Sequence, residues 1–506
     1  MRILSIVCIC LIISSSALSN NVSVANVRLT NQNVTTDVKD IEFDISWENS
    51  WRTSASPANY DACWLFAKYR LTNSTIWNHA SVSATDGDHT APAGSTIDAM
   101  SDGKGLFIFR DADGAGNNSW ENVRINWTYG LDGLADNDSV EIAVFAVEMV
   151  YIPEGGFTLG DGNGTTKSSF SFESFTNNET ALSIGTTISE TLKTDAAVSI
   201  DDATLGTTGI RLDGDGGLDE DNDGVVDHPN FPVGYNAIYC MKYEISQGQY
   251  VAFLNTLNST QANLLITNQT VDDNRQRISG TGTSWTSIYP ERPVRLGWIE
   301  LCAYLDWSGL RPMSETEFEK ICRGPSVAVL REYAWGSTNV FNSSYIINGD
   351  GSGSSTLANP GSATGNASFT TTDDLLDGPL RCGIFAASSN NNSREETGGT
   401  FYGVMEMSGN LSEQAVFLGD PDGRDFDGSH GDGEISSNGY GNVSGWPSFN
   451  GSENRTNDSG FSVRGGGWNL SDILMSISNR ANVTLHPLSR TAGSNGVGGR
   501  GVRTPE

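Results

Sequence analysis

The sequence predicts an α+β protein, in which an N-terminal all-β sandwich is followed by an irregular, loop-rich domain. Apolar and polar residues alternate in short runs near the N-terminus, which is the pattern of strands with one buried face. Two amphipathic helices with clear start and stop signals lie further along. The chain has 57 glycines, and its second part is rich in Asn, Asp and Ser, the residues of turns and loops.

Residues 1–19 have the features of a secretory signal peptide. Arg2 supplies a positive start, Ile3 to Ile13 form an apolar run, and Ala17 to Ser19 give a small-residue cleavage pattern. That apolar run is too short to span a bilayer, and no later stretch is long and apolar enough to do so. We therefore expect an exported protein, secreted or held at a cell surface, without a transmembrane segment.

The net charge of the chain limits its partners. At −31, it repels nucleic acids and anionic membranes, so neither is an expected partner. Such acidity is typical of a soluble surface or of adaptation to salt, and it is also compatible with cation binding.

Residues 20–148 are predicted to form the β-sandwich. Asn, Asp and Gly turns separate the alternating runs, as in a domain of many short strands. The runs are Val22 to Leu29, Ile41 to Trp47, Val123 to Trp127 and Val140 to Val144. His79 and His89 are isolated in this region, and no catalytic constellation accompanies them. We interpret the sandwich as a binding or assembly module.

Two helices are predicted in the second part of the chain. Apolar residues recur three and four apart from Trp298 to Trp307, and the pattern stops at Ser308-Gly309. A second helix starts at Ser314, which forms a capping box with Glu317, and it ends at Gly324.

These helices belong to a series of sequence blocks that resembles the formylglycine-generating enzyme, or sulfatase-modifying factor, family. The blocks are MVYIPEGGFTLG (149–160), KYEISQGQYVAFLN (242–255), RPMSETEFEKICRG (311–324), EYAWG (332–336), YGVMEMSGNLSE (402–413), VRGGGWN (463–469) and GVR (501–503). The resemblance implies a family-like domain over residues 149–506, with a fold related to the C-type lectin-like fold. Residues 161–230 are a Gly-, Asp- and Ser-rich insertion into it.

One acidic stretch of the insertion is a candidate calcium loop. In DEDNDGVVD, Asp219, Asp221 and Asp223 occupy alternate positions and Asp227 follows Gly224, so the carboxylates can converge on one hard cation. The glutamate that closes such loops at the twelfth position is missing. The alternative is an acidic loop that is simply solvated.

The family resemblance implies a second calcium site in the YGVMEMSGNLSE block. The family's ligand positions fall on Glu406, Gly409, Leu411 and Glu413. Two of these residues offer carboxylates, and the other two would act through backbone carbonyl oxygens, which calcium also accepts.

The catalytic groups of the family are missing. Its copper-binding cysteine pair aligns with Leu470 and Met475, and no cysteine occurs after Cys382. The five histidines are far apart in the sequence and do not match the histidine cluster of the iron-dependent branch. We therefore expect neither copper nor iron, and a protein that is not an enzyme.

Five cysteines remain outside the signal segment. This odd number allows at most two disulfides and one free or intermolecular thiol. The residues are Cys63, Cys240, Cys302, Cys322 and Cys382.

Twenty Asn-x-Ser/Thr sequons indicate a glycosylated surface. Representative candidates are Asn33, Asn73, Asn126, Asn258, Asn342, Asn442 and Asn482. The alternative is that Asn, Ser and Thr are favoured together in exposed loops.

Taken together, these features predict an exported structural or adhesive protein that associates with itself in a surface layer or extracellular filament. One alternative is a secreted oxidase or sulfatase-modifying-type enzyme with unrecognised ligands. The other is a lectin-like module that binds a surface glycan or a protein.

Overall fold

The computed structural model describes residues 22–161, 182–184, 218, 227–266, 274–373, 376–449, 459–480 and 496–506. The signal segment, most of the insertion, and the candidates Asp219, Asp221, Asp223 and Asn482 lie outside these described residues.

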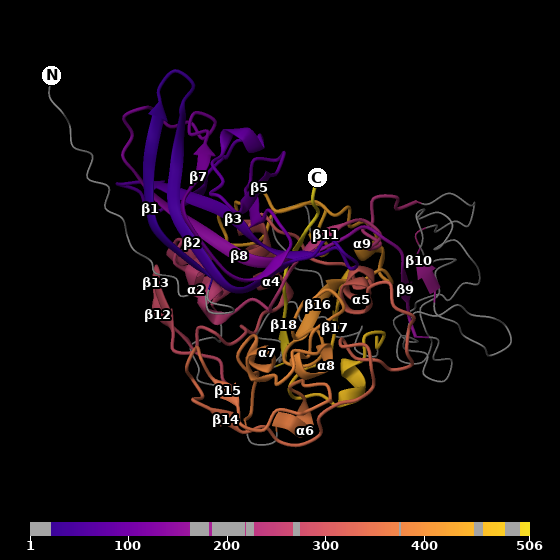
Figure 1. Ribbon diagram of the computed structural model, residues 1–506. Coiled ribbons are helices and arrows are strands. Elements are labelled where there is room, and N and C mark those ends of the chain that lie inside the picture. Colours follow the sequence, from indigo (N-terminus) through magenta and orange to yellow (C-terminus); the bar gives the residue numbers. More distant parts are fainter. Residues whose placement is uncertain are drawn as a thin grey trace.

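The N-terminal part is a two-layer β-sandwich (Figure 1). One layer contains β1 (Ser23–Asn33), β2 (Val38–Arg52) and β7 (Gly114–Trp127), with β2 between the other two. The other layer contains β3 (Tyr60–Leu71), β4 (Asn78–His79), β5 (Ser95–Ala99), β6 (Leu106–Arg110) and β8 (Val140–Ile152). A short 3-10 turn (Asp86–Asp88) precedes β5. Apolar side chains of both layers form one buried cluster, which confirms the predicted sandwich.

Strand β3 is buried on both faces. Cys63, Leu65 and Ala67 belong to the sandwich core, whereas Trp64 and Phe66 belong to the core of the second part. Successive side chains of a strand point to opposite faces, so β3 separates the two cores. The second layer of the sandwich is therefore also a wall of the following domain.

The same sheet continues into the second part of the chain. Strand β8 pairs with β3 on one side and with β11 (Ile238–Met241) on the other, and β11 pairs with β19 (Val502–Arg503). The boundary expected between residues 148 and 149 falls inside β8, whose sequence VEIAVFAVEMVYI contains no turn residue.

Both predicted helices are confirmed. Helix α4 spans Trp298–Trp307 and α5 spans Glu315–Arg323. Ser314 caps α5 by accepting a hydrogen bond from the Glu317 backbone N–H, and the Glu317 carboxylate accepts one from the Ser314 N–H. Helices α2 (Gln247–Leu254) and α3 (Ser259–Leu265) precede them.

The remainder of the second part consists of loops and short elements, as predicted for an α+β, loop-rich domain (Figure 1). The short strands are β9 (Phe157–Leu159), β10 (Leu182–Ile184), β12 (Ile278–Thr281), β13 (Ser284–Ser287), β14 (Ile347–Asn348), β15 (Thr356–Leu357), β16 (Ser412–Val416), β17 (Phe461–Arg464) and β18 (Val497–Gly498). The short helices are α6 (Thr370–Asp373), α7 (Ile384–Ser388), α8 (Arg394–Thr397), α9 (Pro421–Arg424) and a 3-10 turn (Asp472–Met475).

Within the described residues, no helix is both long and apolar enough to cross a membrane. The five cysteines are all buried, and no two of them form a disulfide.

Candidate functional site

The loop from Glu406 to Glu413 is tightly coiled. Glu406, Gly409 and Asn410 have φ angles of +56°, +85° and +66°, in the left-handed region that few non-glycine residues adopt. A glutamate in this conformation stores backbone strain, and such strain is concentrated at functional sites.

Glu244 holds this loop from the neighbouring segment. Its Oε1 accepts a hydrogen bond of 2.8 Å from the Leu411 N–H, and its Oε2 accepts one of 2.5 Å from Asn410 Nδ2. The Gly409 N–H donates to the Gly465 carbonyl at 2.8 Å. These bonds fix the loop against two distant parts of the sequence.

Two carboxylate oxygens in the loop have no hydrogen-bond donor in the part of the chain that the structure describes. Glu406 Oε1 accepts from the Gly383 N–H at 2.9 Å, but its Oε2 is buried and without a partner. Glu413 Oε1 accepts from Arg500 Nε and Nη2 at 2.8 and 2.6 Å, whereas its Oε2 is also buried and unpaired. Leaving a buried acceptor unpaired destabilises a fold unless something else binds it.

The backbone carbonyl oxygens of Gly409 and Leu411 likewise accept no hydrogen bond from any residue that the structure describes. Gly409 and Leu411 are both buried. All four residues of the predicted calcium site, including Glu406 and Glu413, therefore present an oxygen that has no donor among the described residues.

Burial opposes the negative charges here more strongly than the neighbouring arginines and N–H groups favour them. Burial raises the pKa of Glu406 to about 7, and the charge of Glu413 adds to this rise. Burial also raises the pKa of Glu413, against the opposing effect of Arg500, and it raises that of Glu244 well above the ordinary range. A bound cation would favour the ionised forms.

Within the described ranges, no group of three or more His, Cys, Asp or Glu side chains is placed to hold a metal ion. A metal at this loop would therefore need the carbonyl oxygens of Gly409 and Leu411 beside the two carboxylates. Such an all-oxygen donor set fits calcium rather than copper or zinc.

Leu470 and Met475 stand at the positions where we expected the family's cysteine pair to align. Met475 is fully buried and packs in an apolar cluster with Tyr333, Trp335, Ala367 and Phe369. The Leu470 carbonyl accepts a hydrogen bond from the Thr370 N–H at 3.0 Å. Met475 therefore lies in a packed apolar cluster, whereas Leu470 is half-buried outside that cluster.

Only Asp227 of the predicted acidic calcium loop is described. It is exposed, and its N–H donates to the Leu218 carbonyl at 2.7 Å. The calcium hypothesis for this loop remains a prediction.

The predicted glycosylation positions differ in exposure. Asn33, Asn73 and Asn342 are exposed. Asn126, Asn258 and Asn442 are half-buried, and Asn258 caps α3 by accepting from the N–H groups of Thr260 and Gln261.

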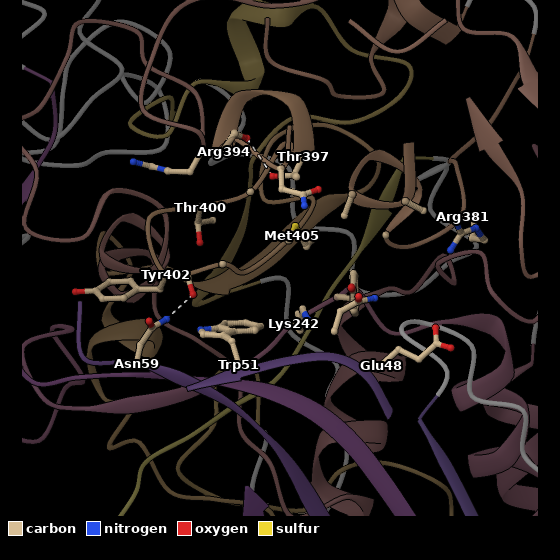
Figure 2. A pocket seen from close by; sticks show the side chains of 18 of the residues that line it. Glu48, Trp51, Asn59, Lys242, Arg381, Arg394, Thr397, Thr400, Tyr402 and Met405 are labelled. Atoms are coloured by element: carbon tan, nitrogen blue, oxygen red, sulfur yellow. Dashed lines mark hydrogen bonds between the residues drawn. The ribbon is translucent and has the colours of Figure 1, made fainter. Parts of the chain in front are cut away.

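A cavity of about 740 Å³ lies where the end of β2 meets the second part of the chain (Figure 2). Its walls include Glu48, Trp51, Asn59, Lys242, Tyr243, Arg381, Arg394, Phe401, Tyr402 and Met405. Sequence reasoning missed it because these residues come from separate segments, none of which carries a recognisable motif.

A comparison with protein families identifies the second part of the chain. The family model described as "Sulfatase-modifying factor enzyme 1-like domain" matches residues 189–494, more than half of the chain. No curated protein matches the chain. Among solved structures, the variable protein 1 of Treponema denticola is similar, with 11% sequence identity and a TM-score of 0.29, over 71% of this chain and 96% of that one.

Proposed function

The chain belongs to the family of sulfatase-modifying factor enzyme 1-like domains, and we propose that it is an exported, non-catalytic member with a structural or adhesive role. The observation that carries this proposal is the pair Leu470 and Met475 at the positions of the family's cysteines. Neither side chain can supply the thiolate that binds copper(I) and starts the reaction, and Met475 is part of an apolar core.

The continuous sheet supports a structural role. Because β8 pairs with both β3 and β11, backbone hydrogen bonds connect the sandwich directly to the family domain. Trp64 and Phe66 of β3 pack in the same core as α4 of the family domain, so no flexible linker separates the two parts. Such a unit can transmit force and present its loops in a fixed orientation.

Calcium binding is part of the proposal. The carboxylates of Glu406 and Glu413 and the carbonyls of Gly409 and Leu411 would hold the ion. Calcium would neutralise the two buried carboxylates and stabilise the coiled loop. The four oxygens without donors support this assignment.

Export and surface location are supported by the pattern of residues 1–19, by the strongly acidic composition and by the twenty sequons. An extracellular environment also contains enough calcium to fill a site of modest affinity. We propose self-association as the means by which the protein builds a layer or filament.

Light scattering and electron microscopy on the purified protein without its signal segment would test this role. We expect defined oligomers or ordered polymers in calcium that dissociate on chelation. A monomer in both conditions would contradict the structural role. Elemental analysis is the second arm, because stoichiometric copper or iron with oxygen consumption would contradict the non-catalytic assignment.

A further inference from the structure

The cavity at the end of β2 is built by both parts of the molecule. Glu48 and Trp51 come from the sandwich, whereas Lys242, Arg394 and Tyr402 come from the family domain. The Asn59 side chain, 3% exposed, donates a hydrogen bond of 2.6 Å to the Tyr402 carbonyl and so fixes one wall against the other. A contact between the two parts of the molecule therefore helps to fix the shape of the cavity.

The charge of the cavity is opposite to that of the chain. Its lining contains three cationic side chains, Lys242, Arg381 and Arg394, and one carboxylate, Glu48. The chain as a whole has a net charge of −31. A positive cavity in such a protein attracts anions locally, and the surrounding negative surface opposes non-specific anion binding.

The two arginines differ from most buried arginines of this protein. Arg311, Arg323 and Arg500 each form an ion pair with a glutamate. Arg381 instead donates to the carbonyls of Ser355 and Cys382, and within the described residues it has no carboxylate partner.

Arg394 is similar. It donates from Nη2 to the Ala334 carbonyl at 3.0 Å, while its Nε is buried without an acceptor, and within the described residues no carboxylate pairs with it. Guanidinium groups without carboxylates are ready to bind an external anion.

Lys242 adds a third donor. It is 2% exposed, and its Nζ donates to Glu148 Oε1 at 2.8 Å. The same nitrogen lies 4.7 Å from the centre of the Trp51 ring and 5.6 Å from that of Tyr243. An ammonium group has three donors, so Lys242 retains hydrogen-bonding capacity among aromatic faces.

Aromatic surface complements these charges. Trp51, Tyr243, Phe401 and Tyr402 line the same cavity. Figure 2 shows Arg381 and Arg394 on opposite sides, with Lys242 and Trp51 between them. A volume of about 740 Å³ lies in the range of small-molecule sites.

We infer that this cavity binds a small acidic saccharide, with the sugar ring against Trp51 and its anionic groups held by Arg394, Lys242 and Arg381. The faces of sugar rings are apolar and pack on aromatic rings. The carboxylate or sulfate groups of the saccharide would accept hydrogen bonds from the N–H groups of these cationic side chains. The inference goes beyond the proposed function, because such a site could serve an enzyme as well as a scaffold.

Isothermal titration calorimetry on the full mature chain tests the inference with three probes: digalacturonate, a sulfated disaccharide, and neutral lactose. We expect an acidic probe to bind at least about tenfold more tightly than lactose, and to bind more weakly as salt is raised. Comparison of the two acidic probes distinguishes carboxylate from sulfate recognition. Equal binding of lactose, or no binding of either acidic probe, would overturn the inference.

Substitutions assign the binding to this cavity. Arg394→Gln should raise the Kd for the acidic probe by about tenfold or more, because it removes a charge-assisted hydrogen-bond donor. It strands no carboxylate, so the fold should survive, and Trp51→Phe provides a second variant with a smaller change. The matched control is Arg331→Gln, which removes the same charge from an exposed position outside the cavity.

Two results would contradict the assignment. One is equal affinity of Arg394→Gln and Arg331→Gln, with Trp51→Phe also unchanged. The other is an acidic peptide that binds in the same cavity more tightly than either saccharide, which would assign the cavity to a protein partner. Self-association is measured independently, so its absence would leave this test intact.

Discussion

Two clusters of buried carboxylates in the family domain differ in how their oxygens are used. In the first cluster, Glu315 accepts from Arg480, Arg464 and the Leu418 N–H, with distances of 2.6 to 3.1 Å. Both of its oxygens have donors. In the second cluster, Glu406 and Glu413 each keep one oxygen without a donor.

The pKa values follow this difference. Burial alone would raise the pKa of Glu319, a member of the first cluster, but the charges of Arg323 and Arg464 lower it below its ordinary value. The pKa of Glu406 rises to about 7 through burial, because no cation is paired with it directly. Each carboxylate of the first cluster thus pairs with arginines, whereas in the second cluster Glu413 pairs with Arg500 and Glu406 has no cation at ion-pair distance among the described residues. Burial by itself does not distinguish a framework carboxylate from a ligand.

The largest expected effect on stability follows from removing one carboxylate of the first cluster. Glu315→Ala should lower the free energy of unfolding by about 3–5 kcal/mol, because Arg464 and Arg480 lose a buried partner. Chemical denaturation measures the change. Glu121→Ala, at an exposed position, is the control, and a loss as small as that of the control would mean that the cluster is not framework.

Chelation should have the next largest effect, and it acts on the second cluster. Calcium at a hundred times its Kd stabilises the native state by about 2.7 kcal/mol. The thermal midpoint should therefore fall on chelation, and Glu406→Gln should lose this dependence. Glu121→Gln should keep it. Identical midpoints with calcium and with chelator would refute the site.

Lys68 tests a third arrangement, a buried cation with no carboxylate at ion-pair distance among the described residues. Its Nζ donates to the Gly433 carbonyl, and the surrounding charges are Glu434, Asp306, Asp432 and Lys104. Burial lowers the pKa of Lys68 to about 7.

Between this value and its ordinary pKa, the unfolded state holds a proton that the folded state lacks. Stability should therefore rise with pH, by up to about 1.4 kcal/mol per unit from this group. Urea unfolding from pH 7 to pH 9 should show a shallower rise for Lys68→Met than for the unaltered chain. Parallel profiles would mean that Lys68 stays charged when folded.

The smallest expected effect on stability comes from glycosylation, which should distinguish exposed asparagines from buried ones. Asn366 and Asn410 occur in sequons but are 1% exposed, and their side chains are hydrogen-bonded. Asn73 and Asn342 are exposed. In a host that glycosylates exported proteins, glycopeptide mass spectrometry should find glycans at the second pair and none at the first. Glycans on folded protein at Asn410 would contradict this packing.

Local signals made part of the fold predictable. The strand alternation, the apolar spacing of Trp298 to Trp307 and the capping box at Ser314 act within a few residues, and the structure contains each of these elements. The four positions of the calcium site at residues 406–413 came from resemblance to a family. Their unpaired oxygens could not be read from the sequence, because hydrogen-bond partners depend on the whole fold.

The sequence by itself determined the order of the two parts, the loop-rich character of the second and the lack of any cysteine after Cys382. Only the tertiary structure decided that β8 joins both parts in one sheet, and that Glu315 meets Arg480, 165 residues away. It also decided that Arg394 and Trp51 share a cavity. The physical reason is that helix caps and strand alternation arise from neighbouring residues, whereas ion pairs and cavities depend on how distant segments pack against one another.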